Sequence, residues 1–206
     1  HRDLHSFPTR RSSDLIKAGL TLGLAGIPYF THDIAGFSGG PSTKELFLRW
    51  TELGAFTPIM RTHDGLQKTE NHRFDSDEQT LAHFMRFSLI HNALAPYFRE
   101  LAVQAQESGL PIIRHTALVD PLWSEALRAH DQWMIGQDML FAPVVTEGAT
   151  TVRVRFPAGE WEHLFTGQAV AGRCTREVDA PLGTPAVFVR RGALADLVAQ
   201  VRQIGP

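Results

Sequence analysis

The sequence has 206 residues and a formal net charge of −2 at pH 7, with 43% hydrophobic, 9% aromatic and 20% charged residues. This composition is typical of a globular chain of one or two domains. It excludes a disordered chain and argues against a nucleic-acid partner or a polybasic membrane surface. No apolar run approaches the roughly 18 to 20 residues that span a bilayer. The single cysteine, Cys174, cannot form an internal disulfide. A cytoplasmic location is favoured, although one cysteine does not fix the compartment.

Residues 1–15 show no helical or strand periodicity and are predicted to be foreign to the protein. The string resembles a translated sequencing adapter joined to an assembled gene fragment, and such a segment adds nothing to a fold. The alternative is a basic targeting peptide, but Asp3 and Asp14 interrupt its positive charge and no apolar segment follows. The natural sequence is then expected to begin upstream of Ile16.

Two short strands are predicted in the first half of the chain. The stretch 18–30 is rich in Ala, Leu and Gly and predicts a helix that runs into a buried strand at 26–30. Asp33 then lies at the carboxyl end of that strand. A second strand at 57–60 delivers the tripeptide 61–63 into a loop. Helices and strands in this order are typical of βα units with parallel strands.

Two longer helices are predicted from their start and stop signals. Ser42 and Ser76 each stand three residues before a Glu or Gln, the pattern of a capping box. The second helix should end at the Gly-Leu-Pro sequence of 109–111, and Pro96 should kink or divide it. The apolar face of the first helix comprises Leu46, Trp50 and Leu53. That of the second comprises Phe84, Phe87, His91, Leu94, Phe98 and Leu101.

Residues 110–206 are predicted to form a separate antiparallel β domain, a β-sandwich. Residues 151–156 alternate between polar and apolar side chains, and the Pro-Ala-Gly sequence that follows turns the chain. The other β-rich runs are 112–113, 139–145, 178–180 and 186–189. A short amphipathic stretch through Ile204 follows and looks like a natural carboxyl terminus.

Polar side chains follow both strands of the predicted pair. Asp33 follows the first strand, with Phe37 close behind, and Arg61 and His63 follow the second. In α/β barrels the functional side chains gather at the carboxyl ends of the strands. A carboxylate, a guanidinium and an imidazole beside an apolar ring suit a sugar, whose hydroxyls need fixed donors and acceptors. The simpler interpretation is an ion pair between Asp33 and Arg61, which is compatible with a sugar site.

Other kinds of site have weaker support. The ten histidines show neither the spacing with Glu of a zinc helix nor a cysteine partner, so neither a metal nor a cofactor is predicted. No phosphate-binding loop and no Gly-x-Ser-x-Gly elbow is present. His91 lies on the apolar seam and is expected to be a core residue with its hydrogen bonds satisfied. Core positions are also expected for the tryptophans, Trp50, Trp123, Trp133 and Trp161, rather than sugar platforms.

Several motifs occur in a fixed order along nearly the whole chain after residue 16. In the first half they are GIP at 26–28, DIAGF at 33–37, ELFLRW at 45–50 and GAFTPIMRTH at 54–63. They continue with LAPY at 94–97, GLPIIR at 109–114, GQDMLFAPV at 136–144 and PAGEW at 157–161. In this order the chain resembles the carboxyl-terminal part of glycoside hydrolase family 31.

The resemblance implies a fold, an activity and a site. Residues 16–109 would be the last part of a (β/α)8 barrel, and residues 110–206 the carboxyl-terminal β-sandwich domain. The activity implied is that of a retaining α-glycosidase on a small-molecule or oligosaccharide α-glycoside, such as an α-glucoside, α-xyloside or sulfoquinovoside. The resemblance also implies that a sugar subsite is lined by Asp33, Phe37, Arg61 and His63.

Two motifs of the family are missing from the chain. Retaining hydrolysis needs two carboxyl groups about 5 to 5.5 Å apart. The family's nucleophile motif, Trp-x-Asp-Met-Asn-Glu, and its acid/base motif, Trp-x-Gly-Asp, occur nowhere in this sequence. A complete barrel also needs about 250 residues. We therefore expect a carboxyl-terminal piece without catalytic residues, inert by itself and with open strand edges.

The sequence leaves the sugar and some alternatives open. Residues 61–65 and 74–75 resemble the sulfoquinovosidase branch, which usually carries Tyr where this chain has Phe37, so a neutral glucoside suits the sequence equally well. One alternative function is a noncatalytic carbohydrate-binding β domain with a helical linker, against which the polar residues after both strands argue. Another is a barrel fragment that serves as an oligomerisation platform.

Overall fold

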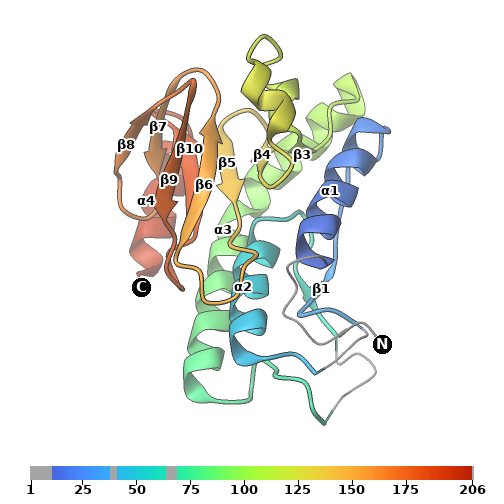
Figure 1. The fold of residues 1–206 in the computed structure, drawn as a ribbon, viewed down its shortest axis with the longest axis vertical. Coiled ribbons are helices and arrows are strands. Elements are labelled where there is room, and N and C mark those ends of the chain that lie inside the picture. The colour runs from blue at the N-terminus through green and yellow to red at the C-terminus, as the bar shows by residue number, and fades with distance from the viewer. Residues whose placement is uncertain (1–10, 38–40, 64–68, 206) are drawn as a thin grey trace.

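The computed structural model describes residues 11–37, 41–63 and 69–205. Its first half is built from helices and two short strands, and its second half from antiparallel strands (Figure 1). The helices are α1 (Arg11–Leu24), α2 (Lys44–Ala55) and α3 (Glu78–Ser108), with strands β1 (Asp33–Ile34) and β2 (Arg61–Thr62) between them. The chain ends in α4 (Ala195–Ile204), where the sequence predicted an amphipathic stretch.

The strands β1 and β2 pair in parallel, as predicted. Asp33 lies opposite Arg61, and Ile34 lies opposite Thr62. Both strands begin later than predicted, because 26–30 and 57–60 contain no strand. Each of these segments carries a proline, at 28 and at 58, which cannot donate an amide hydrogen to a strand ladder. Asp33 and Arg61 are therefore the first residues of their strands and do not follow the strand ends.

Helix α1 begins at Arg11, inside the segment 1–15 that was predicted to show no periodicity. The positions 11–15 are helical, and Leu15 packs against the same core cluster as Ile16, which is only 2% exposed. The helix that buries Ile16 and Leu20 therefore includes residues 11–15, which were predicted to have no periodicity. Residues 1–10 lie outside the described part of the chain, and a foreign origin for the segment stays a prediction.

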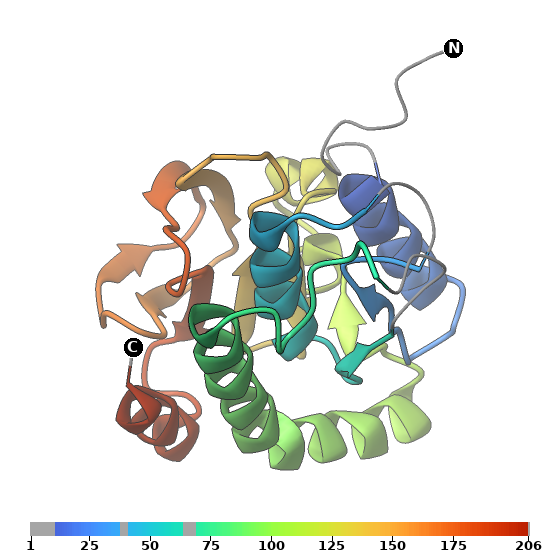
Figure 2. The ribbon, with the colours of Figure 1, turned by 90° about the horizontal axis from the view of Figure 1, so that it is seen from below.

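Helices α2 and α3 each begin one residue later than predicted. Thr43 caps α2 by accepting a hydrogen bond from the amide of Leu46, and Asp77 caps α3 by accepting one from the amide of Thr80. Ser42 instead bonds to the neighbouring loop, where its hydroxyl donates to the carbonyl oxygen of His72. Helix α3 runs unbroken past its internal proline, bends along its length (Figure 2), and ends at a glycine with φ +74°, as predicted.

The second half contains a six-stranded antiparallel sheet and a separate antiparallel pair. The sheet has the order β3-β4-β5-β10-β7-β8, and β6 pairs with β9. The bounds are β3 (Ile113–Arg114), β4 (Trp133–Ile135), β5 (Met139–Ala142), β6 (Thr151–Phe156), β7 (Glu160–His163), β8 (Ala169–Ala171), β9 (Cys174–Asp179) and β10 (Ala186–Arg190). Two 3₁₀ turns, Thr116–Leu118 and Ser124–Arg128, connect β3 to β4. Every predicted β-rich run overlaps a strand, whereas β4, β7 and β8 were not predicted.

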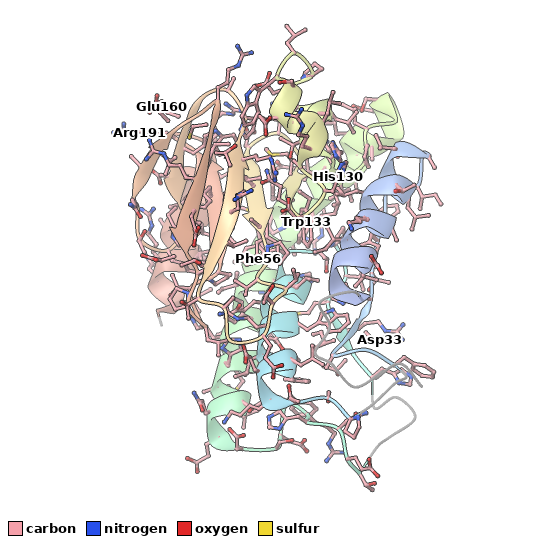
Figure 3. The ribbon with its side chains drawn as sticks, in the orientation of Figure 1. Asp33, Phe56, His130, Trp133, Glu160 and Arg191 are labelled. Carbon is pink, nitrogen blue, oxygen red and sulfur yellow. The ribbon has the colours of Figure 1, made fainter. Side chains whose placement is uncertain are left out.

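The six-stranded sheet has a core on each face. On β5, Met139 and Phe141 belong to the cluster shared with the helices, whereas Leu140 and Ala142 belong to the cluster under β6 and β9. This alternation follows from the two-residue period of a strand. Phe56 of the loop after α2 meets Phe141 with ring centroids 5.1 Å apart, in the middle of the molecule (Figure 3). One hydrophobic core therefore joins the two halves of the chain.

Candidate functional site

Asp33 and Arg61 form an ion pair at the surface of the two-stranded sheet. The guanidinium Nε of Arg61 lies 2.7 Å from Oδ1 of Asp33. The pairing of β1 with β2 puts the two residues side by side, which is why the contact forms. Their side chains are 18% and 49% exposed, so the pair is open to a ligand. Figure 3 shows Asp33 at the lower right of the molecule, far from Glu160 and Arg191 at its upper left.

Phe37 and His63 form a second pair beside the first. Their ring centroids lie 5.0 Å apart in an edge-to-face arrangement, and Phe37 is 45% exposed. The chain turns sharply after β1, where the amide of Gly36 donates to the carbonyl oxygen of Asp33. Gly36 has φ +86°, a conformation that glycine adopts without strain. This turn brings Phe37 back to the loop that follows β2.

A small hollow lies between the two strands and the segment 71–74. His63 lines it, whereas Asp33, Phe37 and Arg61 are not among its lining residues. The segment 71–74 contributes Asn71, His72, Arg73 and Phe74, and the other lining residues are Ile34, Ala35, Gly36, Ser42, Phe47 and Thr62. Sequence reasoning missed Asn71, His72 and Arg73, because they belong to no motif that it used. The convergence of all four predicted site residues on one sugar stays a prediction.

His32, which directly precedes Asp33, points into the interior. Its Nδ1 accepts a hydrogen bond of 2.8 Å from the indole Nε1 of Trp50, and the residue is 8% exposed. Burial lowers the pKa of His32 to about 4, so the ring is neutral at pH 7. Because Nδ1 is the acceptor, the proton of the neutral ring resides on Nε2. No local pattern in the sequence indicates this hydrogen bond.

Three of the other candidates of the sequence analysis lie in the core, and two are half-buried. Trp50, Trp133 and Trp161 are buried as predicted, while Trp123 is half-buried. His91, predicted to be a core residue, is half-buried, and its Nδ1 donates to the carbonyl oxygen of Ala55 at 3.0 Å. Within 11–37, 41–63 and 69–205, no three His, Cys, Asp or Glu side chains are placed to hold a metal ion. In the same ranges, no helix combines the length and apolar composition needed to cross a bilayer.

Acid is expected to destabilise the chain between pH 6.5 and pH 4. Burial lowers the pKa of His32, His83 and His163 to about 4 each, so the unfolded chain binds more protons than the folded one in this interval. Each histidine should cost on the order of 2 kcal/mol of the free energy of unfolding by pH 4.5. Burial raises the pKa of Glu52 to about 7, which contributes with the opposite sign.

Urea unfolding at pH 7.0, 5.5 and 4.5 would measure this pH dependence. The Glu52→Gln variant serves as a control and should show a steeper loss, because the carboxyl group that opposes the three histidines is removed. A free energy of unfolding that stays constant or rises toward pH 4.5 would contradict the expectation.

Two family models match the chain in the order that the motifs suggested. Residues 11–101 match the TIM-barrel domain of the glycosyl hydrolases family 31, and residues 109–194 match the carboxyl-terminal domain of that family. The chain belongs to glycosyl hydrolase family 31. The predicted family and fold class, the last part of a (β/α)8 barrel followed by an antiparallel β-sandwich, are therefore confirmed.

Individual relatives of this family 31 chain include sulfoquinovosidases. The sulfoquinovosidase of Agrobacterium fabrum is 41% identical over 196 residues, covering 93% of this chain and 30% of that protein. The sulfoquinovosidase of Escherichia coli is 35% identical over 93% of this chain and 29% of its own length. A solved family 31 sulfoquinovosidase from E. rectale, in complex with an aza-sugar inhibitor, superimposes with a TM-score of 0.87 at 33% identity. That match covers 91% of this chain and 29% of the solved one. The chain thus spans less than a third of these relatives.

Proposed function

We propose that this chain supplies one wall of the sugar pocket in a retaining α-glycosidase. The observation that carries the proposal is the parallel pairing of β1 with β2, which sets Asp33 against Arg61 at 2.7 Å. A carboxylate held by a guanidinium accepts hydrogen bonds from sugar hydroxyls in a fixed direction. The rings of Phe37 and His63 provide an apolar wall beside it. Parallel strands that carry a polar pair favour this function over a β domain with a helical linker.

The bond-breaking carboxylates of this proposal come from outside the 206 residues. Retaining hydrolysis uses one carboxylate as nucleophile and one carboxyl group as acid and then base. The two family motifs that carry them are absent from the sequence. The part of this chain is therefore to bind and orient the sugar, so that its anomeric carbon lies between the two carboxyl groups. Such orientation accounts for several powers of ten in rate in enzymes generally.

The substrate we favour is an α-linked sulfoquinovoside. Two relatives named above and the solved neighbour are sulfoquinovosidases. The sequence at 61–65 and 74–75 resembles the same branch. A neutral α-glucoside is the second candidate, because Phe37 stands where that branch usually carries Tyr and lacks the phenolic hydroxyl. Neither candidate needs a cofactor.

A chimera tests the proposed function. The aligned part of this chain replaces its counterpart in the Agrobacterium fabrum sulfoquinovosidase, which supplies the rest of the barrel. The chimera is expected to hydrolyse 4-nitrophenyl α-sulfoquinovoside, and the isolated 206-residue chain is expected to give no turnover. The same assay with 4-nitrophenyl α-glucoside separates the two substrates. A chimera with native circular dichroism and no activity on either substrate would contradict the proposal.

A further inference from the structure

One polar stripe of helix α2 is bound to loops of the β half. Glu45, Arg49 and Glu52 recur at spacings of four and three and therefore lie on one face of the helix. Glu45 Oε1 accepts from the amide of Gly148 at 2.8 Å, and Glu52 Oε1 accepts from the amide of Gly183 at 2.6 Å.

Arg49 lies between these two glutamates and completes the stripe. Its Nη1 donates to the carbonyl oxygen of Ala180 and to Glu52, and its Nη2 donates to the carbonyl oxygen of Ala149. Two loops about 30 residues apart in the sequence thus clamp α2 from one side, one of them between β5 and β6 and the other between β9 and β10.

An adjacent stripe of the same helix faces β1. Trp50 is one residue beyond Arg49, which rotates its side chain by about 100° around the helix axis. Its indole donates to His32, the residue directly before Asp33. In an extended backbone, neighbouring side chains point to opposite sides. A His32 side chain that is held in the interior therefore sets the direction in which the Asp33 side chain leaves the backbone, toward the surface.

We propose that Trp50 and His32 are positioning residues that orient the Asp33 carboxylate toward its ligand. The two loops of the β half hold α2, and with it Trp50, in place. Asp33 as a sugar ligand rests on the proposed function, whereas the control of its direction does not. His32 packs between the rings of Phe30 and Trp50, with centroids 5.8 Å from each. An apolar ring would fill that space without burying a polar group. The hydrogen bond from Trp50 adds a constraint that packing alone does not supply, because it holds the His32 side chain in one rotamer.

The Arg61 Nε proton reports on the direction of Asp33 without any substrate. Nε of Arg61 lies 2.7 Å from Oδ1 of Asp33, and the exchange of its proton with water can be followed by NMR in the 206-residue chain. Leucine and asparagine side chains have the same branched shape at Cγ, and only asparagine keeps an acceptor near the position of Nδ1. We expect His32→Leu to raise the exchange rate by about ten-fold and His32→Asn to keep it near wild type. Trp50→Phe, which keeps a ring but removes the donor, should behave like His32→Leu.

Leu53→Ala controls for general loosening of the fold. It removes core packing from the same helix without touching His32, so it should lower the melting temperature while leaving the Arg61 Nε exchange unchanged. Equal exchange rates in His32→Leu and His32→Asn would overturn the proposal, and so would a rise in Leu53→Ala as large as that in His32→Leu.

The chimera separates this proposal from the proposed function. In an active chimera, His32→Leu should lower kcat/KM by about ten-fold, and His32→Asn should restore most of it. If the chimera is inactive but the exchange pattern holds, the proposed function fails while the positioning of Asp33 stands. If the chimera is active and neither kcat/KM nor exchange responds to His32→Leu, the positioning role fails alone.

Discussion

Replacing Asp33 by alanine in the chimera is expected to lower kcat/KM for its aryl α-glycoside by about 10²–10³-fold, the range found when one preorganised polar contact is removed from an active site. The carboxylate is held by Arg61 at 2.7 Å and stays 18% exposed, so it is oriented before the sugar arrives. Alanine would remove the acceptor and leave the guanidinium of Arg61 without its anion. His63→Ala should also reduce activity, because it removes a ring that contacts Phe37.

The control for Asp33→Ala is a carboxylate in a comparable pair away from the site. Asp131 pairs with Arg155 at 3.2 Å, and its side chain is half exposed. Asp131→Ala removes a similar ion pair and should leave kcat/KM unchanged, since surface ion pairs contribute little to stability. Wild-type turnover in both Asp33→Ala and His63→Ala would remove these residues from the proposed sugar site.

Replacing Arg49 by methionine is expected to lower the free energy of unfolding by about 3–5 kcal/mol, the cost of leaving one member of a buried ion pair alone. Arg49 and Glu52 are both buried, with 3.1 Å between Nη1 and Oε2. Burial raises the pKa of Glu52 to about 7 and the charge of Arg49 opposes that rise, so removing Arg49 raises the pKa further. A carboxyl group whose folded pKa exceeds its unfolded one loses stability as pH rises. The loss should therefore be larger at pH 8 than at pH 6, as measured by urea unfolding.

Two further variants test whether the loss of stability in Arg49→Met comes from the buried ion pair. Arg128 and Glu125 form an exposed pair with the same spacing of three residues, so Arg128→Met should change the free energy of unfolding by less than about 1 kcal/mol. The double variant Arg49→Met/Glu52→Gln should recover part of the loss, because no buried carboxylate is left alone. An Arg49→Met variant no less stable than Arg128→Met would show that the buried pair contributes nothing.

Much of the fold was predictable because it depends on local patterns. The period of residues 151–156 predicted β6 with its observed bounds, and the glycine at 109 ended α3 as predicted. Strand and helix starts were less predictable, since they depend on partners. Ser42 had the sequence of a helix cap, but its hydroxyl is bound to the backbone of His72, thirty residues away in the sequence, and Thr43 caps the helix.

Some contacts of the candidate site were likewise predictable from the sequence, and others were not. Asp33 and Arg61 could be paired from the sequence, because parallel neighbouring strands bring equivalent positions together. The hydrogen bond from Trp50 to His32 could not, because the apolar spacing of α2 marks Trp50 only as a core residue. The bonds of Arg49 to Ala149 and Ala180 span 100 and 131 residues, and no local pattern in a sequence carries such information.

The double-sided sheet restricts how this protein can exchange parts with its relatives. A crossover at the boundary between the two matched family domains would take Phe56 from one parent and Phe141, its neighbour at 5.1 Å, from the other. Alternate residues of β5 and β10 face different cores. A β half taken from one parent would therefore keep one face that fits its own strands, whereas its other face would meet helices of the other parent. Viable recombinants should therefore take both matched domains from one parent, or carry compensating changes only on the sheet face that packs against the helices.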